Sequence, residues 1–508
     1  MHDRTIWNSL LYSLSNHIPL ISTFARDPAT AASQLSTKDL ERFVISTYRI
    51  DRTWLQSRGP PISLSIRPKL GIEQDVSHNL TDNRTILSLD TIDDRWLLCV
   101  YHERFLELWD LLSKGSIPTN APADIVCCLC SHLPGDSPCT SSRASLDEDQ
   151  SSIILAVTSN SVCNFFRVVL PVSQNNAAVE AARLESIASI QMTSPTLLAR
   201  SIYPPGQLAF FSYSNSFMIV NWNSHMQWPI DVSDQHEEEL WNGVIGAEFV
   251  TPRHIICVKA HAVELYTLPV SLSESYSSPS IPGVPRANTR VRVDVLSHSF
   301  PNFTFRGVSL STPRFLSLSN RLNANTSASL NFLAYDVLRG LFLYRVSLLL
   351  PPLALDNTYD VPPPHMSASL LAAHHMAMYI GKSTGNPATT STSLPRSGMT
   401  PGTRGFVSTC VLGRTGRRGL WVERKRGSVR RGVVGFSTPI DAWDRSDDLQ
   451  LEEKIGGEAE QDGNDADNDA DAESEANWWD DPNSRFIDGN TIFEVNSYDL
   501  RGQLVLLH

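Results

Sequence analysis

Short apolar segments recur along most of this chain, and tight polar turns separate them. Each unit consists of a short apolar strand, a polar turn and a second strand with an aromatic residue near its end. The units recur roughly every fifty to eighty residues, and they cover residues 86–110, 153–170, 208–222, 246–266, 330–346, 405–423 and 491–507. Charged residues make up only 19% of the chain. This composition and pattern favour many short strands over long surface helices.

The length of the units is typical of small four-stranded sheets arranged in a ring, as in a β-propeller. One such sheet cannot bury both faces alone, whereas sheets stacked around a ring bury each other. A pair of β-sandwiches is the alternative. The ring is favoured because the units continue to the last residues, and residues 61–67, which alternate in polarity, are placed to close against the C-terminal strands. We therefore expect a mainly-β propeller of about six to eight blades over residues 60–508. We expect disordered inserts near 270–290, 382–404 and 441–484.

The first 58 residues follow a different pattern. Helical spacing relates four apolar residues that follow or flank Trp7, namely Ile6, Leu10, Leu11 and Leu14. Residues 36–39 resemble a capping box, and one helical face downstream carries Leu40, Phe43, Val44 and Tyr48. A second helix start is predicted at Asp27 and Pro28. We expect two or three short helices in this N-terminal segment.

Composition also limits the classes of function. A formal net charge of −12 argues against nucleic-acid binding by the whole surface. The first residues lack a basic and then apolar signal pattern, and prolines and an arginine interrupt the most apolar window, residues 341–355. The eight cysteines are irregularly spaced. We expect no membrane association, reduced thiols, and a location in the cytoplasm, the nucleus or both.

Several segments resemble a known family. The Trp-Asp pair that ends residues 106–110 resembles the strand end of a WD repeat, although the other units lack it. Residues 3–11 are similar to the closing stretch of an F-box. Residues 40–45, 49–54 and 419–427 resemble segments of a large group of fungal F-box proteins with a degenerate WD-like propeller. The Leu-Pro start of an F-box does not precede Trp7, so we expect an F-box truncated at its N-terminus.

The resemblance implies a function in protein–protein recognition. Such proteins act as substrate receptors in cullin-type (SCF-like) ubiquitin ligases, where a helix face docks on a Skp-type adaptor and the propeller holds a substrate protein. In this chain, that face would carry Ile6, Trp7, Leu10, Leu11 and Leu14. Alternatively, these side chains only cover one end of the propeller. The identity of the substrate is not encoded in a readable motif, because propellers bind through loops.

A concentration of arginines marks a second candidate surface. It consists of Arg414, Arg417, Arg418, Trp421, Arg424, Lys425, Arg426, Arg430 and Arg431. These residues predict a two-stranded basic ribbon with solvated arginines. A nucleic-acid-associated propeller is an alternative, in which the arginines hold phosphate and Trp421 stacks on a base. A further hypothesis is that the acidic stretch at residues 462–475 folds back over the ribbon and screens it.

No motif indicates catalysis or a cofactor. The cysteines at 127, 128, 130 and 139 with His132 lack zinc-site spacing and favour a strand with buried thiols. The histidines at 365, 374 and 375 favour a loop that leads into a strand at 375–380. The acidic stretch fails the calcium-loop pattern at its sixth and twelfth positions. We expect no enzyme activity and no cofactor or metal, with a propeller hydrolase as the minor alternative.

Overall fold

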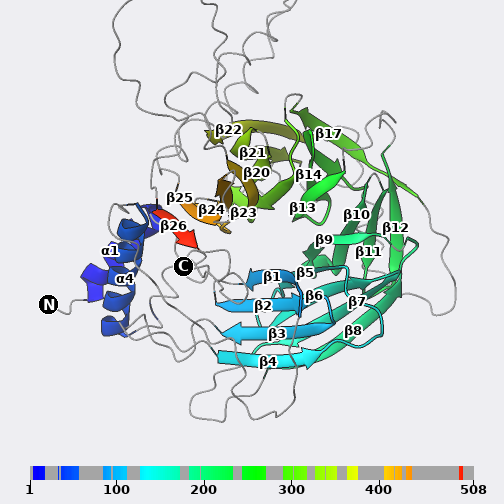
Figure 1. Ribbon diagram of the computed structural model, residues 1–508, viewed down its shortest axis with the longest axis horizontal. Coiled ribbons are helices and arrows are strands. Elements are labelled where there is room, and N and C mark those ends of the chain that lie inside the picture. The colour runs from blue at the N-terminus through cyan, green and yellow to red at the C-terminus, as the bar shows by residue number, and fades with distance from the viewer. Residues whose placement is uncertain are drawn as a thin grey trace, which may run out of the picture.

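The computed structural model describes most of the chain from residue 4 to residue 437. The described residues are 4–17, 33, 36–55, 84–92, 95–110, 126–171, 182–194, 196–214, 216–232, 243–269, 290–300, 303–316, 326–337, 339–351, 363–375, 405–416, 418–425, 431–437 and 491–495. Within them, two helices lie beside six small antiparallel sheets (Figure 1).

The helices are α1 (Arg4–His17) and α4 (Thr37–Leu55), which contact each other. The predicted cap is confirmed at Ser36, whose hydroxyl oxygen accepts from the backbone N–H of Asp39 at 3.2 Å and donates to its carboxylate at 2.6 Å. Leu11 of α1 and Leu40, Phe43 and Val44 of α4 are buried. Tyr48, expected on the same buried face, is exposed. The start predicted at residues 27 and 28 lies outside the described residues.

Each of the first three sheets contains four strands that are consecutive in sequence. The first sheet is β1 (Ile86–Ile92), β2 (Trp96–Tyr101), β3 (Phe105–Asp110) and β4 (Val126–His132). The second is β5 (Ser141–Leu146), β6 (Ser152–Ser159), β7 (Val162–Val169) and β8 (Arg183–Gln191). The third is β9 (Leu198–Tyr203), β10 (Leu208–Tyr213), β11 (Ser216–Asn221) and β12 (Met226–Asp231), and β16 (Val291–Arg292) joins its outer edge in parallel.

The other three sheets repeat this order. The fourth is β13 (Val244–Thr251), β14 (His254–Lys259), β15 (Ala262–Thr267) and β17 (Asp294–Ser299). The fifth is β18 (Gly307–Leu310), β20 (Thr326–Asp336), β21 (Gly340–Leu350) and β22 (His365–His375), with β19 (Arg314–Leu316) also paired to β20. The sixth is β23 (Gly405–Leu412), β24 (Arg418–Lys425), β25 (Arg431–Ser437) and β26 (Thr491–Val495).

The sheets stand around a common centre, and the first strands labelled in Figure 1, β1, β5, β9, β13 and β23, lie nearest to it. Successive inner strands contact each other along the series β1, β5, β9, β13, β18 and β23. The fold is therefore a mainly-β propeller, as predicted, and its six described sheets agree with the expected blade number. The closing strand predicted at 61–67 and, apart from residue 290, the three predicted inserts lie outside the described residues.

The core lies in the seams between neighbouring sheets. The second strand of a sheet is covered on both faces, and β6 is buried along its whole length. At the seam between the fourth and fifth sheets, Phe303 lies 4.5 Å from Phe342 and Phe300 lies 4.8 Å from Tyr344, measured between ring centroids. Aromatic pairs at these separations add stabilisation beyond the area that they bury. These seams hold the inner strands in fixed positions around the centre.

Candidate functional site at the centre of the ring

Serine side chains join the inner strands of neighbouring sheets. Four of the five contacts between inner strands include a hydrogen bond of a serine hydroxyl. The Ser88 and Ser142 hydroxyls bond to each other at 2.5 Å. The other three hydroxyls accept from backbone N–H groups: Ser141 from Ala199 at 2.9 Å, Ser201 from Phe249 at 3.2 Å and Ser309 from Leu412 at 2.9 Å. At the contact of β13 with β18, a Cβ on Gly246 would lie 2.8 Å from a Leu310 methyl, so glycine permits this close approach. These bonds fix the positions of polar side chains around the centre.

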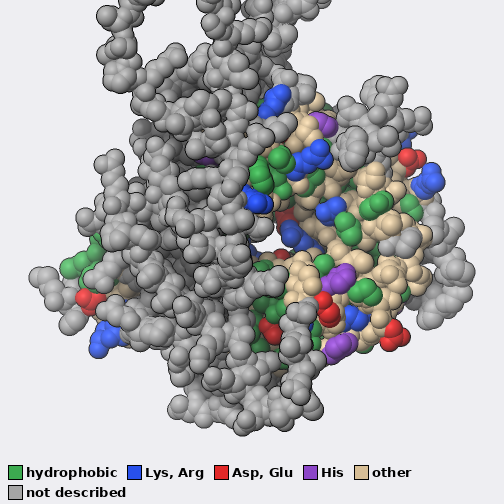
Figure 2. All heavy atoms as spheres, in the orientation of Figure 1, with side chains coloured by type: hydrophobic (Ala, Val, Ile, Leu, Met, Phe, Trp, Pro, Cys, Tyr) green, Lys and Arg blue, Asp and Glu red, His purple; other side chains and the backbone are tan. Residues whose placement is uncertain are grey.

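Five charged side chains from five sheets gather at this centre. They are Asp90 on β1, Arg143 on β5, Arg200 on β9, Glu248 on β13 and Arg414 in the turn between β23 and β24. We call them the channel cluster. Arg143 pairs with Asp90 at 3.9 Å. Figure 2 shows an opening at the centre of the ring with acidic and basic side chains beside it.

The channel cluster is electrostatically coupled. Burial raises the pKa of the Asp90 and Glu248 carboxyls, although the nearby Arg143 and Arg414 guanidinium groups oppose the increase for both. Burial and the like charge of Arg143 lower the pKa of Arg200. Desolvation therefore outweighs the attraction between opposite charges in this region.

A β-bulge sets the position of Arg200. Ser201 pairs with Phe210 and Ala199 pairs with Phe211, so Arg200 is the extra residue of its strand. Its Nε donates to the Ser212 hydroxyl at 3.0 Å and its Nη1 donates to the Ile245 carbonyl at 3.3 Å. Bulges commonly redirect a side chain in this way near functional sites.

Each carboxylate of the channel cluster lies near guanidinium groups. Arg143 and Arg414 act on both Asp90 and Glu248. Within the described part of the chain, no group of three or more His, Cys, Asp or Glu side chains is arranged to hold a metal ion. The cluster thus combines two carboxylates with three guanidinium groups.

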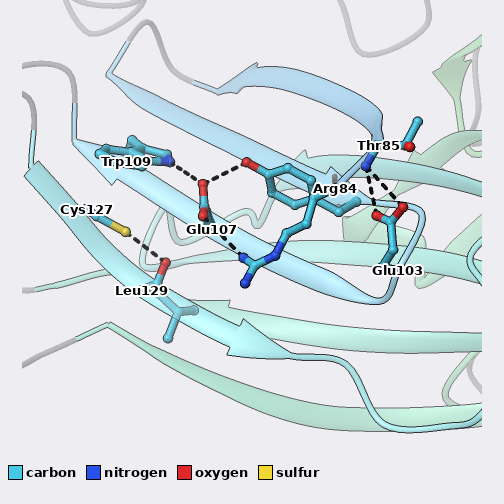
Figure 3. A network of polar contacts seen from close by, with 8 residues as sticks. Arg84, Thr85, Glu103, Glu107, Trp109, Cys127 and Leu129 are labelled. Atoms are coloured by element: carbon cyan, nitrogen blue, oxygen red, sulfur yellow. Dashed lines mark hydrogen bonds and ion pairs between the residues drawn. The ribbon is translucent and has the colours of Figure 1, made fainter. Parts of the chain in front are cut away.

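The Trp-Asp strand end of the first sheet has a structural role (Figure 3). Glu107 is buried and accepts hydrogen bonds from the Tyr101 hydroxyl at 2.9 Å and the Trp109 indole at 3.1 Å, and it pairs with Arg84 at 3.9 Å. Asp110 accepts two bonds from the Arg95 guanidinium, at 3.1 and 2.8 Å. These contacts lock the third strand to its neighbours.

The fourth sheet repeats this arrangement. Glu264, also on a third strand, accepts from the Tyr266 hydroxyl at 2.9 Å and pairs with the Lys259 ammonium at 2.8 Å. In both sheets a cysteine of the second strand lies opposite the glutamate, Cys99 in the first and Cys257 in the fourth. The two sheets therefore share a buried glutamate–tyrosine hydrogen bond opposite a cysteine, an arrangement that the repeating apolar pattern of the sequence does not indicate.

Cysteines and histidines differ partly from expectation. The predicted strand exists as β4, but Cys127 and Cys130 are exposed rather than buried, because β4 is an edge strand. Although Cys127 is exposed overall, partial desolvation of its sulfur and the nearby Glu107 carboxylate raise the pKa of its thiol to about 12, so it is a poor nucleophile. Its Sγ donates to the Leu129 carbonyl (Figure 3). Residues 365–375, most of which were expected to form a loop, are strand β22, so His365 and His374 lie on a strand; apart from His375, the strand expected at 375–380 lies outside the described residues.

The predicted adaptor-binding residues differ in their exposure. Ile6 and Leu10, one turn apart on α1, are 43% and 42% exposed, and Trp7 is half-buried. Leu11 is fully buried and is not available to a partner. Leu14 lies on α1, and its side chain is outside the described residues. Because α4 contacts β25, the helical pair rests against the sixth sheet.

The predicted basic ribbon forms the two middle strands of the sixth sheet, with β23 and β26 on either side. Trp421 is buried beside Phe436 and His374, so it is not available to stack on a base. Arg424 lies 5.9 Å above the Phe406 ring, and Arg418 begins β24. Lys425 and Arg431 lie on strands, but their side chains are not described. Arg417, Arg426, Arg430 and the acidic stretch at 462–475 lie outside the described residues altogether. Among the side chains of this set that the structure describes, Arg414 alone belongs to the channel cluster.

No helix in the described ranges is both long enough and apolar enough to cross a membrane.

Comparisons with known proteins find similarity at the level of structure. No family model and no curated protein matches the sequence. The WD40 domain of SCAP from fission yeast is similar with 11% identity and a TM-score of 0.36, over 70% of this chain and 71% of that chain. The Cps50 (Swd1) β-propeller domain of Myceliophteria thermophila is similar with 9% identity and a TM-score of 0.37, over 70% of this chain and 86% of that chain. The assignment of the fold rests on the six sheets of this chain and their order.

Proposed function

We propose that this protein is a non-enzymatic protein-interaction scaffold, and more specifically a substrate-receptor subunit of a cullin-type (SCF-like) ubiquitin ligase. The observation that supports this proposal is the apolar pair Ile6 and Leu10, which α1 presents outward one turn apart. The domain division is that of a helical adaptor-binding segment, residues 1–58, and a propeller, residues 60–508.

The helical pair has the properties of a docking element. Leu11 is fully buried and α1 contacts α4, so α1 is held in place while Ile6 and Leu10 remain exposed. An amphipathic helix binds a partner groove through apolar residues at this spacing. The Skp-type adaptor is the proposed occupant, and Trp7, at the border of the exposed face, would lie at the rim of the interface. The propeller would hold the substrate protein through its loops.

The proposed location is the cytoplasm, the nucleus or both. All eight cysteines are free thiols, and Cys99, Cys139, Cys163, Cys257 and Cys410 are buried in the seams or on strands. Free buried thiols are typical of a reducing compartment.

The test is co-precipitation of the full chain with the Skp-type adaptor, followed by a binding titration. We expect the Ile6→Ala/Leu10→Ala variant to bind at least about tenfold more weakly, because truncating a buried apolar anchor commonly costs more than 1 kcal/mol. Ser9→Ala is the matched control, since Ser9 is an exposed polar residue of the same helix and its variant should bind like the parent chain. Failure of the parent chain to bind, or equal binding by the double variant, would contradict the proposal.

The alternative of a nucleic-acid-associated propeller is less well supported. Its stacking residue, Trp421, is buried in the sixth sheet. Salt-dependent retention of RNA by the chain, abolished by arginine substitutions in the basic ribbon, would be needed to favour it.

A further inference from the structure

The channel cluster contains more positive than negative charge. Its three arginines, Arg143, Arg200 and Arg414, face two carboxylates, Asp90 and Glu248, which leaves a formal excess of one positive charge. The ion pair within this cluster, Arg143 with Asp90, is long at 3.9 Å. Arg143 acts on Arg200, and Arg143 and Arg414 act on the same two carboxyls. Guanidinium groups gathered in one region without close carboxylate partners can hold an anion.

Solvent reaches this cluster. The Arg143 side chain is 40% exposed and the Asp90 side chain is 19% exposed, although both lie on inner strands. Figure 2 shows an opening at the centre of the ring with acidic and basic side chains beside it, through which solvent can enter. A small solute can therefore approach the arginines without rearrangement of the sheets.

Arg200 is held in place before any ligand binds. Two of its N–H groups donate to neutral acceptors, the Ser212 hydroxyl and the Ile245 carbonyl. A guanidinium carries five N–H donors, so donors remain for a ligand. Because neither acceptor is charged, these bonds orient the side chain without neutralising it.

We propose that the centre of the ring is a binding site for a small oxyanion, such as a sulfate, phosphate or carboxylate group, held by Arg143, Arg200 and Arg414. The anion is either free in solution or carried by an acidic side chain of a partner, and the chemistry of recognition is the same in both cases. This inference does not depend on adaptor binding by α1.

The binding should strengthen in acid. Asp90 and Glu248 compete with the anion for Arg143 and Arg414, and burial favours their protonated forms. Lowering the pH removes these competing charges. Besides the five groups already named, the Cys257 thiol on β14 acts on Arg200, and burial raises the pKa of this thiol, so it stays neutral in acid. The arginines keep their charge between neutral and mildly acid pH. Sulfate keeps its charge between neutral and mildly acid pH, so any change in its affinity with pH reports on groups of the protein.

The experiment is calorimetric titration of the full chain with sodium sulfate at constant ionic strength. We expect saturable binding that weakens at least about tenfold in Arg143→Gln and in Arg200→Gln, because each loses a charge-assisted contact. Arg183→Gln is the matched control, since it removes the same charge from the exposed outer strand β8, and we expect it to bind as the parent chain does. Near-ultraviolet circular dichroism checks folding, and Arg143, the more accessible residue, keeps the test valid if Arg200→Gln does not fold.

A change of opposite sign completes the design. Asp90→Asn removes a competing carboxylate, so sulfate should bind several-fold more tightly, whereas Glu185→Gln on the outer strand should have no effect. Acetate and a short oligoglutamate peptide are then compared as competitors of sulfate. Equal competition would support a free anion as the ligand, and stronger competition by the peptide would support an acidic side chain of a partner. Absence of saturable sulfate binding, or equal affinities in the parent chain and both arginine variants, would overturn the proposal.

Discussion

Phe305 is a sensitive probe of the seam between the fourth and fifth sheets. Its side chain is only 1% exposed. The ring lies between Phe300 at 5.3 Å, Phe303 at 6.0 Å, Tyr344 at 6.1 Å and Phe332 at 6.3 Å, measured between centroids. Replacement by alanine would remove a buried ring from contact with both sheets and leave a cavity that these aromatic side chains cannot fill.

We expect Phe305→Ala to lower the free energy of unfolding by about 4 kcal/mol, the middle of the range for a buried Phe→Ala change. The assay is equilibrium urea denaturation followed by tryptophan fluorescence. Phe315→Ala is the control, because Phe315 on β19 is 52% exposed and its loss should change stability by no more than about 0.5 kcal/mol. A loss below about 1 kcal/mol for Phe305→Ala would refute the argument that the two sheets form one continuous core at this seam.

Three further perturbations test individual contacts. Burial lowers the pKa of His254 to about 4, so the unfolded state binds the proton first, and acidification from about pH 7 to about pH 4 should cost roughly 3 kcal/mol of stability. Urea midpoints measured at both pH values should depend less on pH in His254→Phe than in the parent chain. An equal pH dependence in the two proteins would contradict this assignment. Ser201→Ala removes the acceptor of the Phe249 N–H, so stability should fall by about 1–3 kcal/mol and hydrogen exchange at that amide should accelerate, whereas unchanged exchange would argue against the serine contact. Lys259→Met leaves the buried Glu264 carboxylate without its cation, so it should lower the free energy of unfolding by about 3–5 kcal/mol. Thermal denaturation should show that the double variant Lys259→Met/Glu264→Leu recovers part of this stability, and a single variant as stable as the parent chain would count against the buried pair.

The middle strands were the most predictable part of the fold. Strands such as β2, β6 and β14 are packed between two neighbouring sheets, so nearly every residue is buried and the sequence shows a continuous apolar run. The cap of α4 was also predictable, because Ser36 and Asp39 satisfy backbone groups within one turn. Both signals are local in sequence.

The inner and outer strands were harder to predict from sequence. Strand β5 has the sequence SSRASL, and its polar residues contact a neighbouring inner strand and the channel rather than a core. Strand β22 was expected to be a loop, because its histidines and serines carry no apolar alternation. Such strands form because the sheet supplies hydrogen-bond partners, which no single segment reveals.

The channel cluster was missed for a related reason. Arg143 and Arg200 are single charged residues in serine-containing stretches, separated from Asp90, Glu248 and Arg414 by long distances in sequence. Only the ring brings the five together. The sequence feature that could have indicated the cluster is a charged residue in the polar stretch before an apolar run. It indicates a position at the centre of the ring only after that stretch has been recognised as an inner strand.

The most direct test of the account is hydrogen exchange measured by mass spectrometry on the full chain, alone and with the Skp-type adaptor. The central claim is that a propeller carries α1 as its docking element. The account predicts slower exchange in α1 when the adaptor is present, with the inner strands β5, β9 and β13 unchanged. Protection that falls on the sheets while α1 exchanges at its original rate would contradict it.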